Sequence, residues 1–107
     1  MSEDKIVVFS TASSIDEAEK ITQALLEARK VACVNIVPEI LSRYWWQNKI
    51  CRDNEVLLIA KTKRGYLKDV INIVKENHSY ETPEIIALNI VDGSPEYLNW
   101  LSNEIKF

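Results

Sequence analysis

Glycine and histidine are scarce in this chain of 107 residues, which contains two glycines and one histidine. The isolated Gly65 and Gly93 exclude a glycine-rich phosphate loop and a dinucleotide-binding fingerprint, because both motifs need several glycines at fixed spacing. One histidine cannot form a metal site alone, so any metal would need ligands of other kinds. No nucleophile lies in a recognisable elbow either. We therefore expect a protein that is not an enzyme.

Cysteines and long apolar runs are also rare. Cys33 and Cys51 are too few for a disulfide framework, and each lies in a strand-like run, so we expect two reduced, core-buried thiols in a cytoplasmic protein. No apolar run approaches the ~20 residues that span a bilayer, and the polar N-terminus does not resemble a signal peptide. The net charge of −3 argues against a nucleic-acid partner, since such proteins need a concentrated basic surface.

Apolar residues make up 47% of the chain, which is enough for one core in a single domain, residues 1–107. Strand and helix periodicities alternate along it. The predicted elements are a strand at 5–11, a helix at 14–30, a strand at 31–37, a hairpin at 40–61, a helix at 67–77, a strand at 85–91 and a helix at 94–105. This β-α-β-β-α-β order, followed by α, predicts an α+β fold. It is the ferredoxin-like split βαβ sandwich, with helices on one face of an antiparallel four-stranded sheet.

Three local signals mark the ends of these elements. Ser14 and Glu17 have the spacing of a capping box, in which each side chain accepts from an unpaired amide of the helix start. Asp16 and Glu17 together are typical of a solvated helix start. Pro38 interrupts a strand, which indicates an edge strand or a bulge.

The hairpin at 40–61 is much longer than the ~5–6 residues of a typical strand. It has Tyr44, Trp45 and Trp46 at its tip. The sheet face without helices would leave apolar residues in water, and unpaired strand edges recruit other chains. We therefore expect an oligomer whose subunits pack sheet to sheet and exchange hairpin edges.

Four segments occur in a characteristic order over nearly the whole chain. They are 28–35, Tyr44-Trp45-Trp46 with Lys49-Ile50, Lys61-Thr62, and 78–88, and the segment 97–101 fits with them. Together they resemble the CutA divalent-cation tolerance family. The resemblance implies a ferredoxin-like homotrimer with a role in the response to divalent metal ions, copper in particular.

The resemblance also implies two sites. Metal ligands would be His78 and Glu84, with copper or another divalent cation as the bound ion. A ligand cleft between subunits would consist of Asn35, Trp46, Glu55, Lys61, Tyr80 and Glu84. A neutral imidazole suits copper, zinc or nickel. However, some bacterial relatives have a cysteine and a histidine pair where this chain has Ser10 and Asn77-His78, which argues against high-affinity copper binding by that set.

Several alternatives remain open at this point. His78 is otherwise a loop histidine that caps the preceding helix or meets solvent, and Trp45 and Trp46 are otherwise anchors of a subunit interface. A PII-like regulatory or scaffold trimer without a metal role has the same architecture. An RNA-recognition domain shares the element order, but its third strand carries aromatics that stack on bases, and residues 56–60 contain none.

Overall fold

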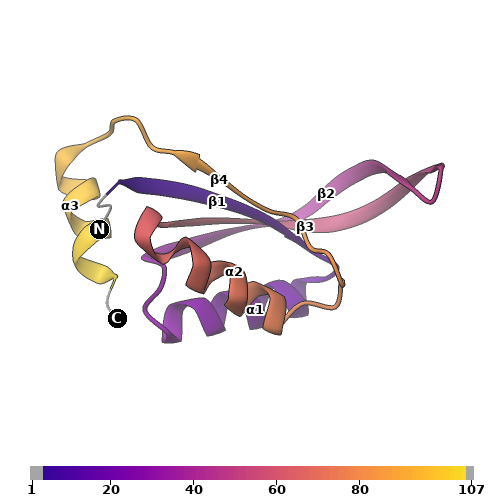
Figure 1. The fold of residues 1–107 in the computed structure, drawn as a ribbon, viewed down its shortest axis with the longest axis horizontal. Coiled ribbons are helices and arrows are strands. Elements are labelled where there is room, and N and C mark those ends of the chain that lie inside the picture. The colour runs from indigo at the N-terminus through magenta and orange to yellow at the C-terminus, as the bar shows by residue number, and fades with distance from the viewer. Residues whose placement is uncertain (1–3, 106–107) are drawn as a thin grey trace.

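The computed structural model describes residues 4–105, and it contains the predicted α+β, ferredoxin-like arrangement (Figure 1). The elements are β1 (Lys5–Ala12), α1 (Ile15–Glu27), β2 (Cys33–Trp46), β3 (Lys49–Lys63), the 3-10 turn η1 (Arg64–Tyr66), α2 (Leu67–Glu76), β4 (Ile85–Asn89) and α3 (Pro95–Glu104). All strand pairs are antiparallel, in the order β2-β3-β1-β4. Both edge strands therefore have one unpaired side in this chain.

Helices α1 and α2 lie side by side against one face of the sheet, and the core lies between the two layers (Figure 1). The core includes Ile6, Val8, Ile21, Leu25, Val56, Leu58, Val70 and Val74. From Lys5 to Ser10 in β1, buried side chains alternate with half-buried ones. In the single chain, most of β1 and the base of β3 are therefore buried on one face only, because α1 and α2 cover only one face of the sheet.

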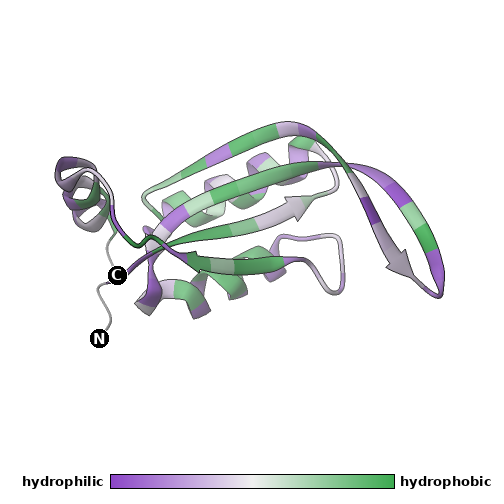
Figure 2. Ribbon diagram, turned by 90° about the horizontal axis from the view of Figure 1, so that it is seen from above, coloured by the Kyte–Doolittle hydropathy of each residue, from purple (hydrophilic) through white to green (hydrophobic). Residues whose placement is uncertain are grey.

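On the face away from α1 and α2, no helix of residues 4–105 lies over the middle of the sheet, and α3 lies toward one end (Figure 2). In β4, the side chains of Ile86 and Leu88 are 53% and 58% exposed. They pair in register with Phe9 and Val7 of β1, so all four side chains share this uncovered face. The face is apolar, as the sequence predicted, and it is open to solvent in one chain.

The element ends differ from the predicted ones where the backbone changes direction. Helix α1 ends at Glu27 and not near Lys30, because Arg29 adopts a left-handed φ of 59°. Strand β4 ends at Asn89 and not at Val91. The predicted helix starts are confirmed, since the Ser14 hydroxyl accepts from the Glu17 amide at 3.1 Å and the Ser94 hydroxyl accepts from the Tyr97 amide at 3.5 Å.

The hairpin formed by β2 and β3 extends well beyond the two helices (Figure 1). The register shifts between Val37 and Ile40, which places the predicted irregularity at Pro38 on an edge strand. A two-residue turn joins the strands, and its residues Gln47 and Asn48 both have positive φ, 50° and 64°. We call residues 40–46 and 49–55 the arm. Among residues 4–105, no helix is long and apolar enough to cross a membrane.

Candidate functional site

The loop between α2 and β4 contains the only histidine of the chain, and its imidazole is completely buried. Its Nε2 lies 2.6 Å from the carbonyl oxygen of Thr11, at the end of β1. Because a carbonyl only accepts, Nε2 carries the proton, and Nδ1 is then free to accept from the Tyr80 amide at 3.0 Å. Both ring nitrogens of His78 are therefore used inside the protein. The imidazole does not meet solvent, so that alternative is wrong. The main-chain amide of His78 donates to the Lys75 carbonyl at the end of α2 at 3.4 Å, so the residue does cap this helix, through its backbone.

Glu17 holds the same loop against the start of α1. Its carboxylate accepts from the Ser13 amide at 2.9 Å, the Ser13 hydroxyl at 3.0 Å and the Ser79 amide at 2.7 Å. Burial opposes the ionised form, but these hydrogen bonds outweigh it and lower the pKa of Glu17 to about 2. Since its side chain is 11% exposed, the prediction of a solvated helix start is wrong for Glu17. The capping box is also altered, because Glu17 binds the amide of Ser13 and not that of Ser14.

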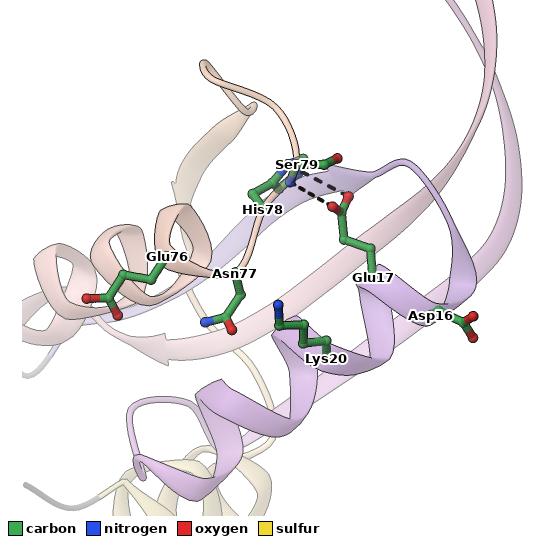
Figure 3. Close-up of a pocket in the computed structure, with 7 residues that line it drawn as sticks. All are labelled: Asp16, Glu17, Lys20, Glu76, Asn77, His78 and Ser79. Atoms are coloured by element: carbon green, nitrogen blue, oxygen red, sulfur yellow. Dashed lines mark hydrogen bonds and ion pairs between the residues drawn. The ribbon is translucent and has the colours of Figure 1, made fainter.

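An open depression of about 320 Å³ lies between the start of α1 and the end of α2 (Figure 3). It is lined by Asp16, Glu17, Lys20, Glu76, Asn77, His78 and Ser79. The carboxylate of Glu17 points toward His78 and Ser79, whereas that of Asp16 points away from them (Figure 3). Within residues 4–105, no three His, Cys, Asp or Glu side chains are grouped so that they could hold a metal ion.

Two tyrosine–carboxylate pairs lie along one face of the hairpin, one at the base of the arm and one within the arm. The Tyr80 hydroxyl donates to Glu55 at 2.9 Å, and the Tyr44 hydroxyl donates to Asp53. Burial and the bond to Glu55 raise the pKa of Tyr80. The bond to Asp53, with a smaller effect of burial, raises the pKa of Tyr44 to about 12. Glu55 is only 8% exposed, so its tyrosine partner compensates the burial of a charged group.

The residues of the predicted cleft do not converge within one chain. Glu55 is joined to Tyr80, whereas Lys61 donates to Asn35. Six positions along β3 separate Glu55 from Lys61, which is about 20 Å in a regular strand. Trp46 lies at the tip of the arm, where it is 60% exposed.

These strand residues nevertheless share one side of the sheet. Asn35 pairs with Ile59 and Trp46 pairs with Lys49, so both lie on the side of the odd-numbered residues of β3, with Glu55 and Lys61. The buried residues of β3 are even-numbered from Val56 to Thr62 and face the helices. The predicted cleft residues of β2 and β3 therefore belong to the uncovered face.

The predicted metal ligands both attach to the end of β1. His78 contacts the Thr11 carbonyl, and the main-chain carbonyl of Glu84 accepts from the Ser10 hydroxyl at 2.7 Å. Glu84 is exposed while the imidazole is buried. A metal ion on His78 would have to displace the Tyr80 amide or the Thr11 carbonyl. The assignment of His78 and Glu84 as metal ligands stays a prediction. Metal binding to His78 would cost the free energy of the hydrogen bond that it displaces.

Both cysteines are free, but neither belongs to the core of the single chain. Cys33 is half-buried, with its sulfur 3.5 Å from the hydroxyl of Tyr97 in α3. This contact, with a smaller effect of burial, raises the pKa of Tyr97 to about 12. Cys51 is half-buried in the arm. The prediction of two core thiols is wrong, because Cys33 pairs with Lys61 and Cys51 is itself an odd-numbered residue of β3, so both lie on the side of the sheet away from α1 and α2.

Sequence reasoning missed the roles of Glu17, Asp53 and Tyr44 at this end of the molecule. The spacing of Ser14 and Glu17 located a helix cap, but it could not show that Ser79 would come within hydrogen-bond distance of the same carboxylate. The alternation of the hairpin places Tyr44 opposite Cys51 and next to Asp53 on one face, so a register prediction would have found that pair.

Comparison with known proteins gives a consistent result. The family described as CutA1 divalent ion tolerance protein matches residues 6–104. The chain is 42% identical over 101 residues to "Protein CutA, chloroplastic" of Arabidopsis thaliana, which covers 94% of this chain but only 56% of that protein. The chain thus spans a little over half the length of that relative.

Two solved structures are similar to it over nearly their whole length. The divalent cation tolerance protein Cut A1 from Thermus thermophilus has a TM-score of 0.93 and 42% identity, covering 95% of this chain and 99% of that one. The protein named periplasmic divalent cation tolerance protein CutA from Archaeoglobus fulgidus has a TM-score of 0.92 and 39% identity, with the same coverage.

Proposed function

The chain belongs to the CutA1 divalent ion tolerance family, and on that premise we propose that it works as a homotrimer in the response to divalent metal ions, copper among them. Its clefts between subunits bind a divalent cation or a small anionic ligand. The role is binding and not catalysis, since the names of the relatives describe tolerance and no reaction.

The uncovered sheet face is the observation that carries this proposal. Ile86 and Leu88 are more than half exposed there, and Trp46, on the same side of the arm, is 60% exposed. Each 100 Å² of apolar surface that a sister chain covers is worth about 2.5 kcal/mol. Burial of this face therefore provides a driving force for assembly. The proposed number of three subunits comes from the resemblance to the family.

Assembly would also complete the cleft. Asn35, Glu55 and Lys61 lie on the uncovered face, so a sister chain that covers the apolar residues also encloses these polar ones. A cleft at such a boundary has a few oriented polar groups among apolar walls, which is the usual character of a small-ligand site. Glu55 and Lys61 of one chain are about 20 Å apart, so each would meet groups from a neighbouring chain.

Sedimentation tests the assembly. At micromolar concentration we expect a particle with the mass of three chains. A well-folded particle with the mass of one chain would remove both the trimer and its clefts.

Copper titration of the tag-free trimer tests the metal proposal separately. We expect about one ion per subunit and at least about tenfold weaker binding in Glu84→Gln, because a lost carboxylate ligand costs more than 1.4 kcal/mol. Glu84 is exposed, so this variant should fold, and Glu81→Gln in the same loop is the matched control. Stoichiometry well below one ion per subunit, or equal affinities in the two variants, would overturn it.

A second candidate is a PII-like regulatory or scaffold trimer without a metal role. It is favoured by the hydrogen bonds that engage both nitrogens of His78, and by the absence of a three-residue ligand group within residues 4–105. A thermal-shift screen of anionic metabolites in the presence of a chelator separates the two candidates. Stabilisation without metal favours the second.

The proposal locates the protein in the cytoplasm, where two unpaired cysteines stay reduced. The relatives from Arabidopsis thaliana and Archaeoglobus fulgidus are named chloroplastic and periplasmic. Fractionation of the source cells, with detection by antibody, tests the location, and recovery outside the cytoplasmic fraction would contradict it.

A further inference from the structure

The two faces of the arm differ in charge. Residues directly opposite each other across the ladder share a face, and successive residues alternate. The outer face consists of Leu41, Arg43, Trp45, Ile50, Arg52 and Asn54. The inner face carries both carboxylates of the arm, Asp53 and Glu55. The outer face has two arginines and no carboxylate.

The two arginines lie in direct register opposite each other. Like charges in this position are unfavourable, and neither guanidinium takes part in an ion pair with any residue in the range 4–105. Both side chains are exposed. On a chain with a net charge of −3, Arg43 and Arg52 form a local basic surface without an ion-pair partner among residues 4–105.

Large apolar side chains lie on both sides of this arginine pair. Toward the tip, Trp45 and Ile50 are opposite each other and are 71% and 65% exposed. Toward the base, Leu41 is 56% exposed. A shallow hollow of about 170 Å³ there is lined by Leu41, Arg52, Asp53 and Asn54, and the carboxylate of Asp53 accepts from Tyr44. Exposed Trp and Arg side chains in one patch have the composition of interface hot spots.

The outer face would stay free in the proposed trimer. Along β3, inner-face residues such as Glu55 continue into the uncovered face of the sheet, whereas Asn54 continues into Val56 and Leu58 under the helices. Sister chains that bury the uncovered face would therefore meet the inner face of the arm. The outer face then points away from the assembly, on the side of α1 and α2.

We propose that this outer face docks an acidic segment of another protein. Carboxylates of that segment bind the guanidinium groups of Arg43 and Arg52, and apolar side chains pack on Trp45, Ile50 and Leu41. A nucleic acid is disfavoured, because two arginines on an acidic chain provide too few phosphate contacts. The inference that the outer face points away from the assembly rests on the proposed trimer. The residue composition of the outer face does not depend on the trimer.

Fluorescence anisotropy with a short labelled peptide, in which glutamate and leucine alternate, tests the docking. The same peptide with lysine for glutamate is the control ligand. We expect weak, salt-sensitive binding in the micromolar range, as for small transient interfaces. In Arg52→Glu, the new carboxylate pairs with Arg43 across the ladder, so the arm should be retained while peptide binding falls at least about tenfold.

Lys68→Glu on α2 is the matched control, since it makes the same charge change at an exposed position outside the arm. Equal binding by Arg52→Glu and Lys68→Glu, or no binding of the acidic peptide by the unaltered protein, would overturn the proposal. Sedimentation of each protein distinguishes a failure of the docking proposal from a failure of the proposed trimer. A trimer that does not bind the peptide refutes only the docking, and single chains refute the assembly. If trimers instead associate with one another through Arg43 and Arg52, the occupant is a second copy and the inference of a foreign partner is wrong.

Discussion

Glu17→Gln isolates the contribution of one buried charge to stability. The Glu17 carboxylate accepts from Ser13 and Ser79, and it thereby joins the start of α1 to the loop that follows α2. Glutamine keeps the size of the side chain and one acceptor oxygen but removes the charge. Hydrogen bonds to charged groups contribute about 1.5–3 kcal/mol, roughly twice the value for neutral pairs.

The lowered pKa gives an independent magnitude. A decrease from 4.5 to about 2 corresponds to at most about 3.5 kcal/mol, because one pKa unit is about 1.4 kcal/mol. The side chain is 11% exposed, so solvent screening reduces this value. We expect Glu17→Gln to lower the free energy of unfolding by about 2 kcal/mol at pH 7.

The pH dependence provides the decisive comparison. Since the pKa of Glu17 is lower in the folded chain, its contribution is complete above pH 4.5 and is lost as the pH falls toward 2. The difference between the unaltered protein and Glu17→Gln should therefore shrink toward zero over that range. Urea unfolding measures this difference in stability. The protein concentration must be the same in all measurements, because the stability of an oligomer depends on concentration.

Glu19→Gln is the control, because Glu19 is an exposed acid on the same helix. It should change stability by less than about 0.5 kcal/mol. A difference for Glu17→Gln that stays constant from neutral to acid pH, or that equals the control, would refute the assignment of charge-assisted bonds to this carboxylate.

Three further changes test other parts of the structure by urea unfolding. Tyr80→Phe leaves the buried carboxylate of Glu55 without its donor and should cost about 1–3 kcal/mol, whereas Tyr44→Phe in the exposed pair should cost clearly less; equal losses would contradict the burial argument. Asn48→Ala keeps the β-carbon at a φ of 64° but removes the polar side-chain group that makes asparagine tolerant of this conformation, and it should cost about 1 kcal/mol, while Asn48→Gly should be neutral or stabilising. Ser14→Ala removes the cap of α1 and should cost about 1 kcal/mol, and a neutral result would contradict the capping bond.

Local patterns located most of the elements, because each depends on residues that are close in sequence. Helix α2 follows from the spacing of Val70 and Val74, and its last residue, Glu76, with Asn77 as the C-cap, lies within one position of the predicted end. Proline at position 38 marked the irregular edge strand. These signals fail at element ends such as Arg29, where one backbone angle decides where the helix stops.

The sequence by itself determined the order of strands and helices, the resemblance to the CutA family and the presence of an apolar face that needs a cover. Periodicity and motif order are local properties, so they can be recognised without coordinates. Only the tertiary structure decided that His78 is buried against Thr11, that Glu17 binds Ser79 and that Tyr80 reaches Glu55. These contacts join residues up to 67 positions apart. They depend on how α1 and α2 pack on the sheet and not on any neighbouring residue in the chain.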